Sequence, residues 1–112
     1  MIADRVENWL SLDQAAEQLG LSTSKVRRLI EEHVLFAVKI EKQLMIPADL
    51  IQNGEPLPSI RGTMLQLLDI GLSESEAINW LYEENDYLTE TPIAALKKGH
   101  KAPVRRAAQN LG

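Results

Sequence analysis

The chain has 112 residues, of which 45% are hydrophobic and 25% are charged, and it contains no cysteine. This composition is typical of a globular protein, and the lack of cysteine excludes disulfides and thiolate metal sites. The net charge of −4 argues against uniform attraction to nucleic acid, although a local basic patch is compatible with it. No apolar run approaches the roughly 20 residues that span a bilayer, and the N-terminus shows no signal-peptide pattern. We therefore expect a cytoplasmic protein with no membrane partner.

The first predicted elements are two short helices joined by a tight turn. Ser11 and Gln14 have the spacing of a capping box, and apolar residues then recur at helical spacing until Gly20. Ser22 caps a second predicted helix, over residues 22–32. Two helices separated by a turn of about three to four residues that contains Gly have the spacing of a helix-turn-helix.

Two β-prone runs, residues 34–40 and 44–46, follow these helices. The polar residues 41–43 separate them, so the pattern predicts a small β-hairpin. Pro47 then opens a short helical turn. Helices and hairpin in this order predict a winged helix-turn-helix over residues 1–53.

The second half, residues 54–112, is predicted to be helical. Residues 52–58 are rich in turn formers and are expected to connect two packed halves. Each half alone is small for a stable core, so we expect one cooperative unit in which the C-terminal helices pack on the winged helix. The predicted helix starts are Ser59, Ser73 (with Glu76 as capping-box partner), Thr91-Pro92 and Pro103, and the predicted stops are Gly71 and Gly99. The residues expected to cover the preceding helices are Ile93, Leu96, Val104, Ala108 and Leu111. The predicted fold class is thus mostly α with a small β-hairpin.

The charges are distributed unevenly along the chain. Residues 69–90 contain seven acids and no Lys or Arg, whereas residues 97–106 contain five Lys or Arg and no acid. A third cluster, Lys25, Arg27 and Arg28, lies in the second predicted helix. Each run is either a solvated helix face or a contact surface.

The position of the third cluster favours a contact surface. With Val26, Leu29 and Ile30 pointing inward at about 3.6 residues per turn, the outward face consists of Ser24, Arg27, Arg28 and Glu31. An arginine fork matches guanine O6 and N7 in the major groove, and hydroxyls near a helix start suit phosphates. The alternative is an ordinary amphipathic helix with solvated arginines, and Glu31 and Glu32 oppose DNA binding unless Glu31 accepts from a cytosine amino group.

The segment from Trp9 to Ser22, followed by Val26–Ile30, resembles the MerR and excisionase type of winged helix, with an Ala-Ala pair, a Leu-Gly turn and a basic second helix. Leu35–Val38 and Met45–Pro47 resemble the wing strands of that family. With its helical tail, the whole chain is similar to a small actinobacterial DNA-binding family whose mycobacterial member is a substrate of the Ser/Thr kinase PknL. The resemblance implies binding of double-stranded DNA. The candidate DNA-binding residues are Ser22, Thr23, Ser24, Lys25, Arg27 and Arg28 on the helix, and Lys39 and Lys42 on the wing.

The chain also departs from MerR regulators proper, which dimerise through a long coiled coil and sense an effector with a further domain. It shows no sustained heptad pattern and no cysteine sensor. We therefore expect no metal, no cofactor and no small-molecule effector. Because the chain begins close to the first helix without a long Thr-bearing leader, we do not expect kinase regulation.

The sequence predicts a DNA-binding protein, and specifically a transcriptional regulator, that reads the major groove with helix 22–32 and contacts the backbone with the 36–46 wing. We expect it to associate with the nucleoid when bound to DNA. The alternative is a protein-interaction module, antitoxin-like or adaptor-like, acting through the acidic 69–90 surface or the basic tail. A homodimer is a further candidate state, since one winged helix contacts only one half-site. We do not expect an enzyme, because His33 and His100 lie near no catalytic constellation, and His33 suits the C-terminal dipole of the second helix.

Overall fold

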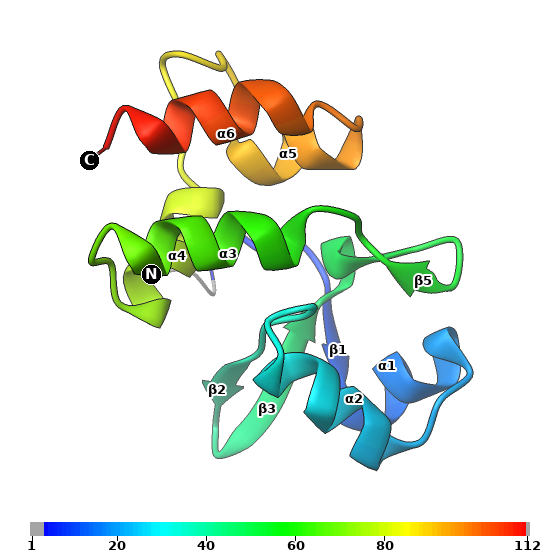
Figure 1. Cartoon of the computed structure of the whole chain (residues 1–112). Coiled ribbons are helices and arrows are strands. Elements are labelled where there is room, and N and C mark those ends of the chain that lie inside the picture. The colour runs from blue at the N-terminus through cyan, green and yellow to red at the C-terminus, as the bar shows by residue number, and fades with distance from the viewer. Residues whose placement is uncertain (1–3, 112) are drawn as a thin grey trace. The chain divides into compact units, whose positions relative to one another are not determined.

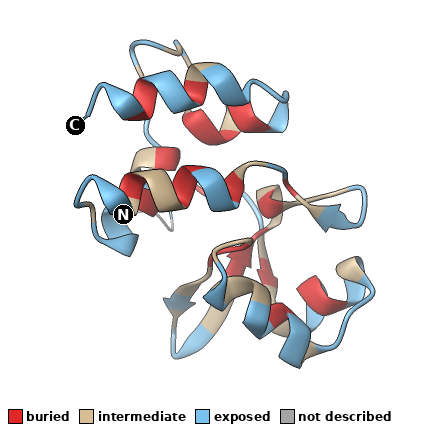
Figure 2. Cartoon of the chain, viewed as in Figure 1, coloured by how far each residue is buried: buried red, intermediate tan, exposed pale blue. Residues whose placement is uncertain are grey.

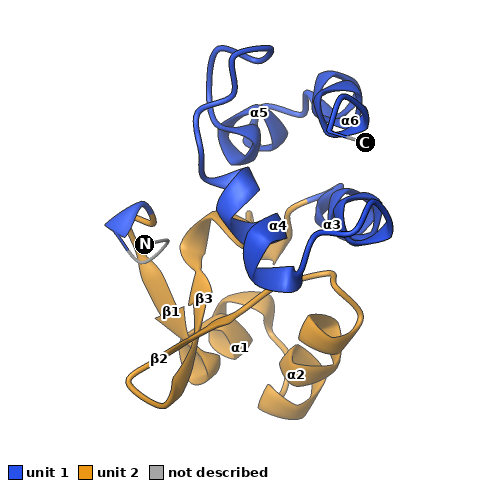
Figure 3. Cartoon of the chain, turned by 90° about the vertical axis from the view of Figure 1, so that its left-hand side faces the viewer, with its two compact units in different colours: residues 1–5, 58–112 blue, residues 6–57 orange. Residues whose placement is uncertain are grey.

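The computed structural model describes residues 4–111, and its helices and strands fall into two units. The winged unit is Val6–Leu57, and the C-terminal unit comprises residues 58–112 together with residues 1–5 (Figure 3). Arg5 belongs to the second unit, where its Nη1 donates to the backbone oxygen of Tyr82 at 3.3 Å. The chain therefore crosses between the units twice, once before Val6 and once after Leu57.

The winged unit is built on a three-stranded antiparallel sheet in the order β1-β3-β2. In the sheet, Leu10 pairs with Ile46, and Val38 pairs with Met45. Strand β1 was not predicted; it has three residues and leads directly into the first helix (Figure 1). The elements are β1 (Trp9–Ser11), α1 (Leu12–Leu19), α2 (Thr23–Glu31), β2 (Val38–Ile40) and β3 (Gln43–Pro47).

Local capping explains the bounds of α1 and α2, and it confirms the predicted helix-turn-helix. Ser11 and Gln14 form a reciprocal capping box at the start of α1. Gly20 ends α1 with φ +69°, a left-handed conformation that costs glycine little. The Oγ of Ser22 then accepts from the backbone N–H of Lys25 at 3.2 Å and starts α2.

The wing is shorter than predicted, because β2 begins at Val38 rather than at residue 34. The backbone N–H groups of Val34 and Leu35 both donate to the oxygen of Leu29, so this segment closes the end of α2 and does not pair in the sheet. Leu35 and Phe36 are fully buried and contribute to the core instead.

The predicted connector at residues 52–58 contains a second hairpin. After the short 3-10 helix η2 (Ala48–Leu50), which corresponds to the predicted helical turn, β4 (Ile51–Gln52) pairs with β5 (Glu55–Pro56). The two residues between these strands, Asn53 and Gly54, have φ values of +55° and +78°, the left-handed conformation that two-residue hairpin turns require. The predicted boundary between residues 53 and 54 falls inside this turn.

Within residues 58–111, the C-terminal unit contains four α-helices, as predicted: α3 (Ile60–Asp69), α4 (Glu74–Leu81), α5 (Pro92–Lys97) and α6 (Lys101–Gln109). Ser73 and Glu76 form the predicted capping box of α4, and the Oγ1 of Thr91 accepts from the backbone N–H of Ala94 at the start of α5. Helix α3 contacts both α4 and α6, and α5 contacts α4 and α6. None of the helices in the described range is long and apolar enough to cross a membrane.

Three predictions for this unit are wrong. Ser59 has a left-handed φ of +76°, and its side chain does not cap α3. Helix α6 begins at Lys101, two residues before Pro103. Pro103 is tolerated there because the N–H groups of the first helical turn have no intrahelical partner, so the missing N–H of proline removes no helical hydrogen bond. Leu111 lies beyond the end of α6 and is 49% exposed, so it does not cover the neighbouring helices.

Both units contain buried, mostly aliphatic side chains (Figure 2). Four of the five residues expected to cover the C-terminal helices, Ile93, Leu96, Val104 and Ala108, are buried, which confirms that α5 and α6 belong to the folded unit. Fully buried core residues of the winged unit include Val26, Leu35, Phe36, Ile46 and Leu50, and those of the C-terminal unit include Ile60, Met64, Leu67, Leu81 and Val104.

Candidate nucleic-acid interface

Helix α2 presents the outward face that its periodicity predicts. Val26 is fully buried, and Leu29 and Ile30 are half-buried. On the other side, Ser24, Arg27, Arg28 and Glu31 are exposed. The helix therefore offers two arginines to an approaching partner without any change in the core.

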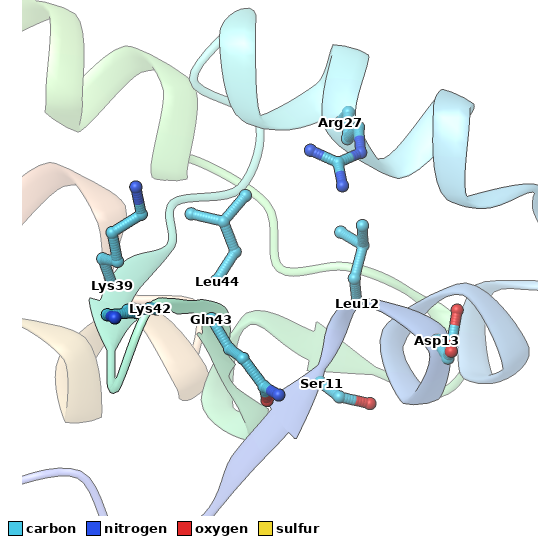
Figure 4. A pocket seen from close by; sticks show the side chains of 8 residues that line it. All are labelled: Ser11, Leu12, Asp13, Arg27, Lys39, Lys42, Gln43 and Leu44. Atoms are coloured by element: carbon cyan, nitrogen blue, oxygen red, sulfur yellow. The ribbon is translucent and has the colours of Figure 1, made fainter.

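The structure gathers three of the predicted residues around one open groove of about 610 Å³. Arg27 reaches it from α2, and Lys39 and Lys42 reach it from the wing (Figure 4). The start of α1 forms the third side. The remaining lining residues are Ser11, Leu12, Asp13, Gln43 and Leu44.

The other five predicted residues lie outside this groove. The hydroxyl of Ser22 accepts the N–H of Lys25, so its first role is to cap α2. Thr23 is half-buried, whereas Ser24, Lys25 and Arg28 are exposed on α2. Ser24 and Arg28 are one turn apart and share the exposed face of α2 with Arg27.

Residues of α1 and of β3 that were not predicted as site residues also line the groove. Asp13 and Gln43 add polar groups, and Leu12 and Leu44 are half-buried apolar side chains at its lining. Gln43 was placed in the predicted turn, but no signal in the sequence indicated that the first turn of α1 faces the wing.

The charge of the groove is predominantly positive. Its lining includes three cations, Arg27, Lys39 and Lys42, and one carboxylate, Asp13. Within residues 4–111, no carboxylate forms an ion pair with any of these three cations. Unneutralised cations around a concave surface attract anions, and phosphate oxygens accept charge-assisted hydrogen bonds from both Lys and Arg.

His33 ends α2 in an unusual way. It follows the C-cap residue Glu32 with φ +64°, where glycine or asparagine is common, and its N–H donates to the oxygen of Ile30. Its Nδ1 atom is buried and has no hydrogen-bond partner in the structure. In the described part of the chain, no group of three or more His, Asp or Glu residues is arranged to hold a metal ion.

Comparisons with known proteins match both halves of the chain. Residues 2–51 match the family described as DNA-binding protein Rv2175c, wHTH domain, and residues 57–112 match the Rv2175c C-terminal domain of unknown function. The DNA-binding protein Rv2175c of Mycobacterium tuberculosis is 32% identical over 123 residues, covering 98% of this chain and 84% of that protein. The NMR structure of Rv2175c superposes with a TM-score of 0.83 at 28% identity, covering 94% of this chain and 81% of that one.

Proposed function

Because the chain belongs to the Rv2175c family and carries its winged helix-turn-helix domain, we propose that it binds duplex DNA through α2 and the wing. The observation that carries the proposal is the convergence of Arg27, Lys39 and Lys42 on one groove. A helix and a wing that present cations to the same space suit the major groove and the adjacent phosphates.

In the proposed complex, α2 and the wing contact different parts of the DNA. Arg27 and Arg28 are the candidates for reading guanine from α2, and Ser24 and Lys25 near the start of that helix suit phosphates. Lys39 and Lys42 contact the backbone from the wing. We propose the same use of helix and wing as in the MerR and excisionase type.

Transcriptional regulation is the biological role that we propose for this binding. The protein would then act in the cytoplasm, on the nucleoid, as a binding protein and not as an enzyme. One winged helix covers one half-site of DNA, so we propose that a homodimer or a protein partner supplies the second contact that specific binding needs. Selection of bound fragments from a random duplex pool would identify that site.

The decisive experiment is binding of the full chain to duplex DNA over a range of salt concentrations. If the five cations on α2 and the wing all contact phosphates, they should contribute about −4 to −5 to the slope of log K against log salt, and an arginine that reads guanine instead lowers the magnitude by about one. Binding that does not depend on salt, or no binding at low salt, contradicts the proposal.

Substitution of the arginines locates the binding site. Arg27→Ala and Arg28→Ala should each weaken binding by about 1–3 kcal/mol if the side chain reads guanine, and by less if it contacts only phosphate. Both side chains are exposed, so thermal unfolding of the variants should match that of the wild type. Unchanged affinity after removal of both arginines would place the site elsewhere on the chain.

A further inference from the structure

We propose that helix α6 forms a second contact surface for the phosphate backbone of duplex DNA, a proposal that rests on the proposed function of the winged unit. The contact residues are Lys101, Arg105 and Arg106, which we call the α6 cations.

Acidic and basic residues are separated along the C-terminal unit. Five of the six Lys and Arg residues in residues 58–112 lie between positions 97 and 106, where no acid occurs. The seven acids of that range lie between positions 69 and 90. An ion pair connects the two stretches: Lys98 Nζ lies 2.6 Å from Glu90 Oε1. Lys98 is therefore partly neutralised.

The α6 cations are not neutralised in this way. All three are exposed, and within residues 4–111 none of their side chains makes an ion pair or a hydrogen bond. Three adjacent positive side chains in this state attract a polyanion at low and physiological salt.

The cations also stand on a fixed helix and not on a mobile arm. Val104, Ala107 and Ala108 of α6 are buried. The Nε2 of Gln66 on α3 donates to the backbone oxygen of Arg105 at 3.0 Å, and α6 contacts α3 and α5 (Figure 1). Lys101 and Arg105 lie one turn apart on the same side of the helix, about 6 Å along its axis, which is close to the axial spacing of every second phosphate on one strand.

The positions of the α6 cations lower the stability of the helix when no ligand is bound. Lys101 is the first residue of α6, where the helix dipole disfavours a positive charge, and the first turn holds no acid. Lys101 and Arg105 repel each other at i,i+4 spacing. Local choices that oppose stability are expected at functional positions.

The remaining surface of α6 favours a nucleic acid over a protein partner. Besides its cations, the helix exposes only Ala102 and Gln109. The centre of a protein–protein interface is usually rich in aromatic and large apolar residues, and α6 exposes none. Phosphate contacts need only well-placed positive charges.

The test compares variants of the full chain in salt-dependent binding to a duplex of about two helical turns. Arg105→Ala/Arg106→Ala should reduce the magnitude of the salt slope by about two, one unit per lost phosphate contact, while Arg105→Lys/Arg106→Lys should keep it. Arg61→Ala is the control for net charge, since Arg61 is an exposed arginine on α3 of the same unit. It should change the slope less than Arg105→Ala alone.

Amide chemical shifts of the full chain during the same titration separate the outcomes. Shifts at both residues 23–44 and residues 97–106 support the inference. Shifts confined to residues 23–44, with a slope unchanged by Arg105→Ala/Arg106→Ala, overturn it and leave the proposed function intact. Shifts confined to residues 97–106 overturn the proposed role of the winged unit instead. If oligoglutamate changes the amide chemical shifts of residues 97–106 and DNA does not, the surface binds an acidic protein and the inference is wrong.

Discussion

Helices α1 and α4 begin with the same arrangement of side chains, and the third helical residue distinguishes them. In α1 the backbone N–H of Ser11 donates to Gln14 Oε1, and in α4 the N–H of Ser73 donates to Glu76 Oε1, both at 2.8 Å. Of these two capping boxes, only that of α4 contains an ionisable side chain, Glu76. The hydrogen bond from the backbone of Ser73, reinforced by its side chain, lowers the pKa of Glu76 below its ordinary value.

This residue gives the first prediction, the pH dependence of Glu76→Gln. Because the pKa of Glu76 is lower in the folded state than in the unfolded state, the ionised carboxylate stabilises the fold above its unfolded pKa. That contribution is lost as pH falls through the lowered folded pKa. The melting temperature of the wild type should therefore exceed that of Glu76→Gln at neutral pH, and the difference should shrink in acid.

The first box supplies the matched control. Gln14→Glu should acquire the same pH dependence at the start of α1, since Gln14 occupies the equivalent position. Melting curves from neutral to strongly acidic pH measure both effects. A constant difference between wild type and Glu76→Gln across that range would show that the charge of Glu76 does not matter.

At the scale of elements, the two hairpins of the winged unit use different residues for the same turn. Both have two residues between paired positions, and all four of these residues have positive φ. Asn53-Gly54 is the preferred chemistry for such a turn, whereas Glu41 and Lys42 in the wing have φ values of +50° and +70° at a steric cost. The wing therefore keeps a cation at Lys42 at the expense of backbone stability.

The second prediction follows for Lys42→Gly. The change to glycine removes a steric cost of about 1–2 kcal/mol at positive φ. About 0.4–1 kcal/mol of this gain is offset by the greater freedom of glycine in the unfolded chain, so we expect a net stabilisation of about 1 kcal/mol or less. If the wing contacts phosphate, the same variant should bind duplex DNA more weakly and lower the magnitude of the salt slope by about one. Thermal melts and salt titrations measure the two effects.

Lys42→Asn controls for the backbone, since asparagine tolerates the left-handed conformation but carries no charge. It should lose DNA affinity like Lys42→Gly. A glycine variant that is more stable and binds as tightly as the wild type would remove Lys42 from the interface.

At the scale of the whole molecule, the C-terminal unit depends on its last two helices. Ile93, Leu96, Val104 and Ala108 are each at most 4% exposed, and α6 contacts α3. Truncation after Tyr87 removes these side chains and exposes the apolar faces of α3 and α4. We expect the melting temperature to fall by several degrees or more, since about 1 kcal/mol shifts a domain of this size by about 4–8 °C.

Calorimetry of the full chain tests the expected cooperativity at the same time. The winged unit and the C-terminal unit are each small for an independent core, and the chain crosses between them twice. We predict a single transition with equal calorimetric and van't Hoff enthalpies. Two separate transitions would show that the units fold independently, and an unchanged melting temperature after truncation would show that α5 and α6 contribute little.

The sequence alone determined most of the helices and the face that α2 exposes. Ser11, Ser73 and Thr91 cap helices through hydrogen bonds to residues three positions away, and Gly20 ends one through its own φ. Signals of this kind act within one helical turn, so the order of residues is sufficient to read them. The hairpin at Asn53-Gly54 was not predicted: residues 52–58 were expected to form a connector, although this pair is a strong local turn signal.

The tertiary structure decided which distant residues meet. Strand β1 is a strand because Leu10 pairs with Ile46, and no pattern in three residues predicts that partner. The groove exists because the sheet brings Asp13 of α1 and Gln43 of β3 near Arg27 of α2. Contacts between residues so far apart in the chain depend on how whole helices and strands pack against each other. The local preferences of single residues do not specify that packing.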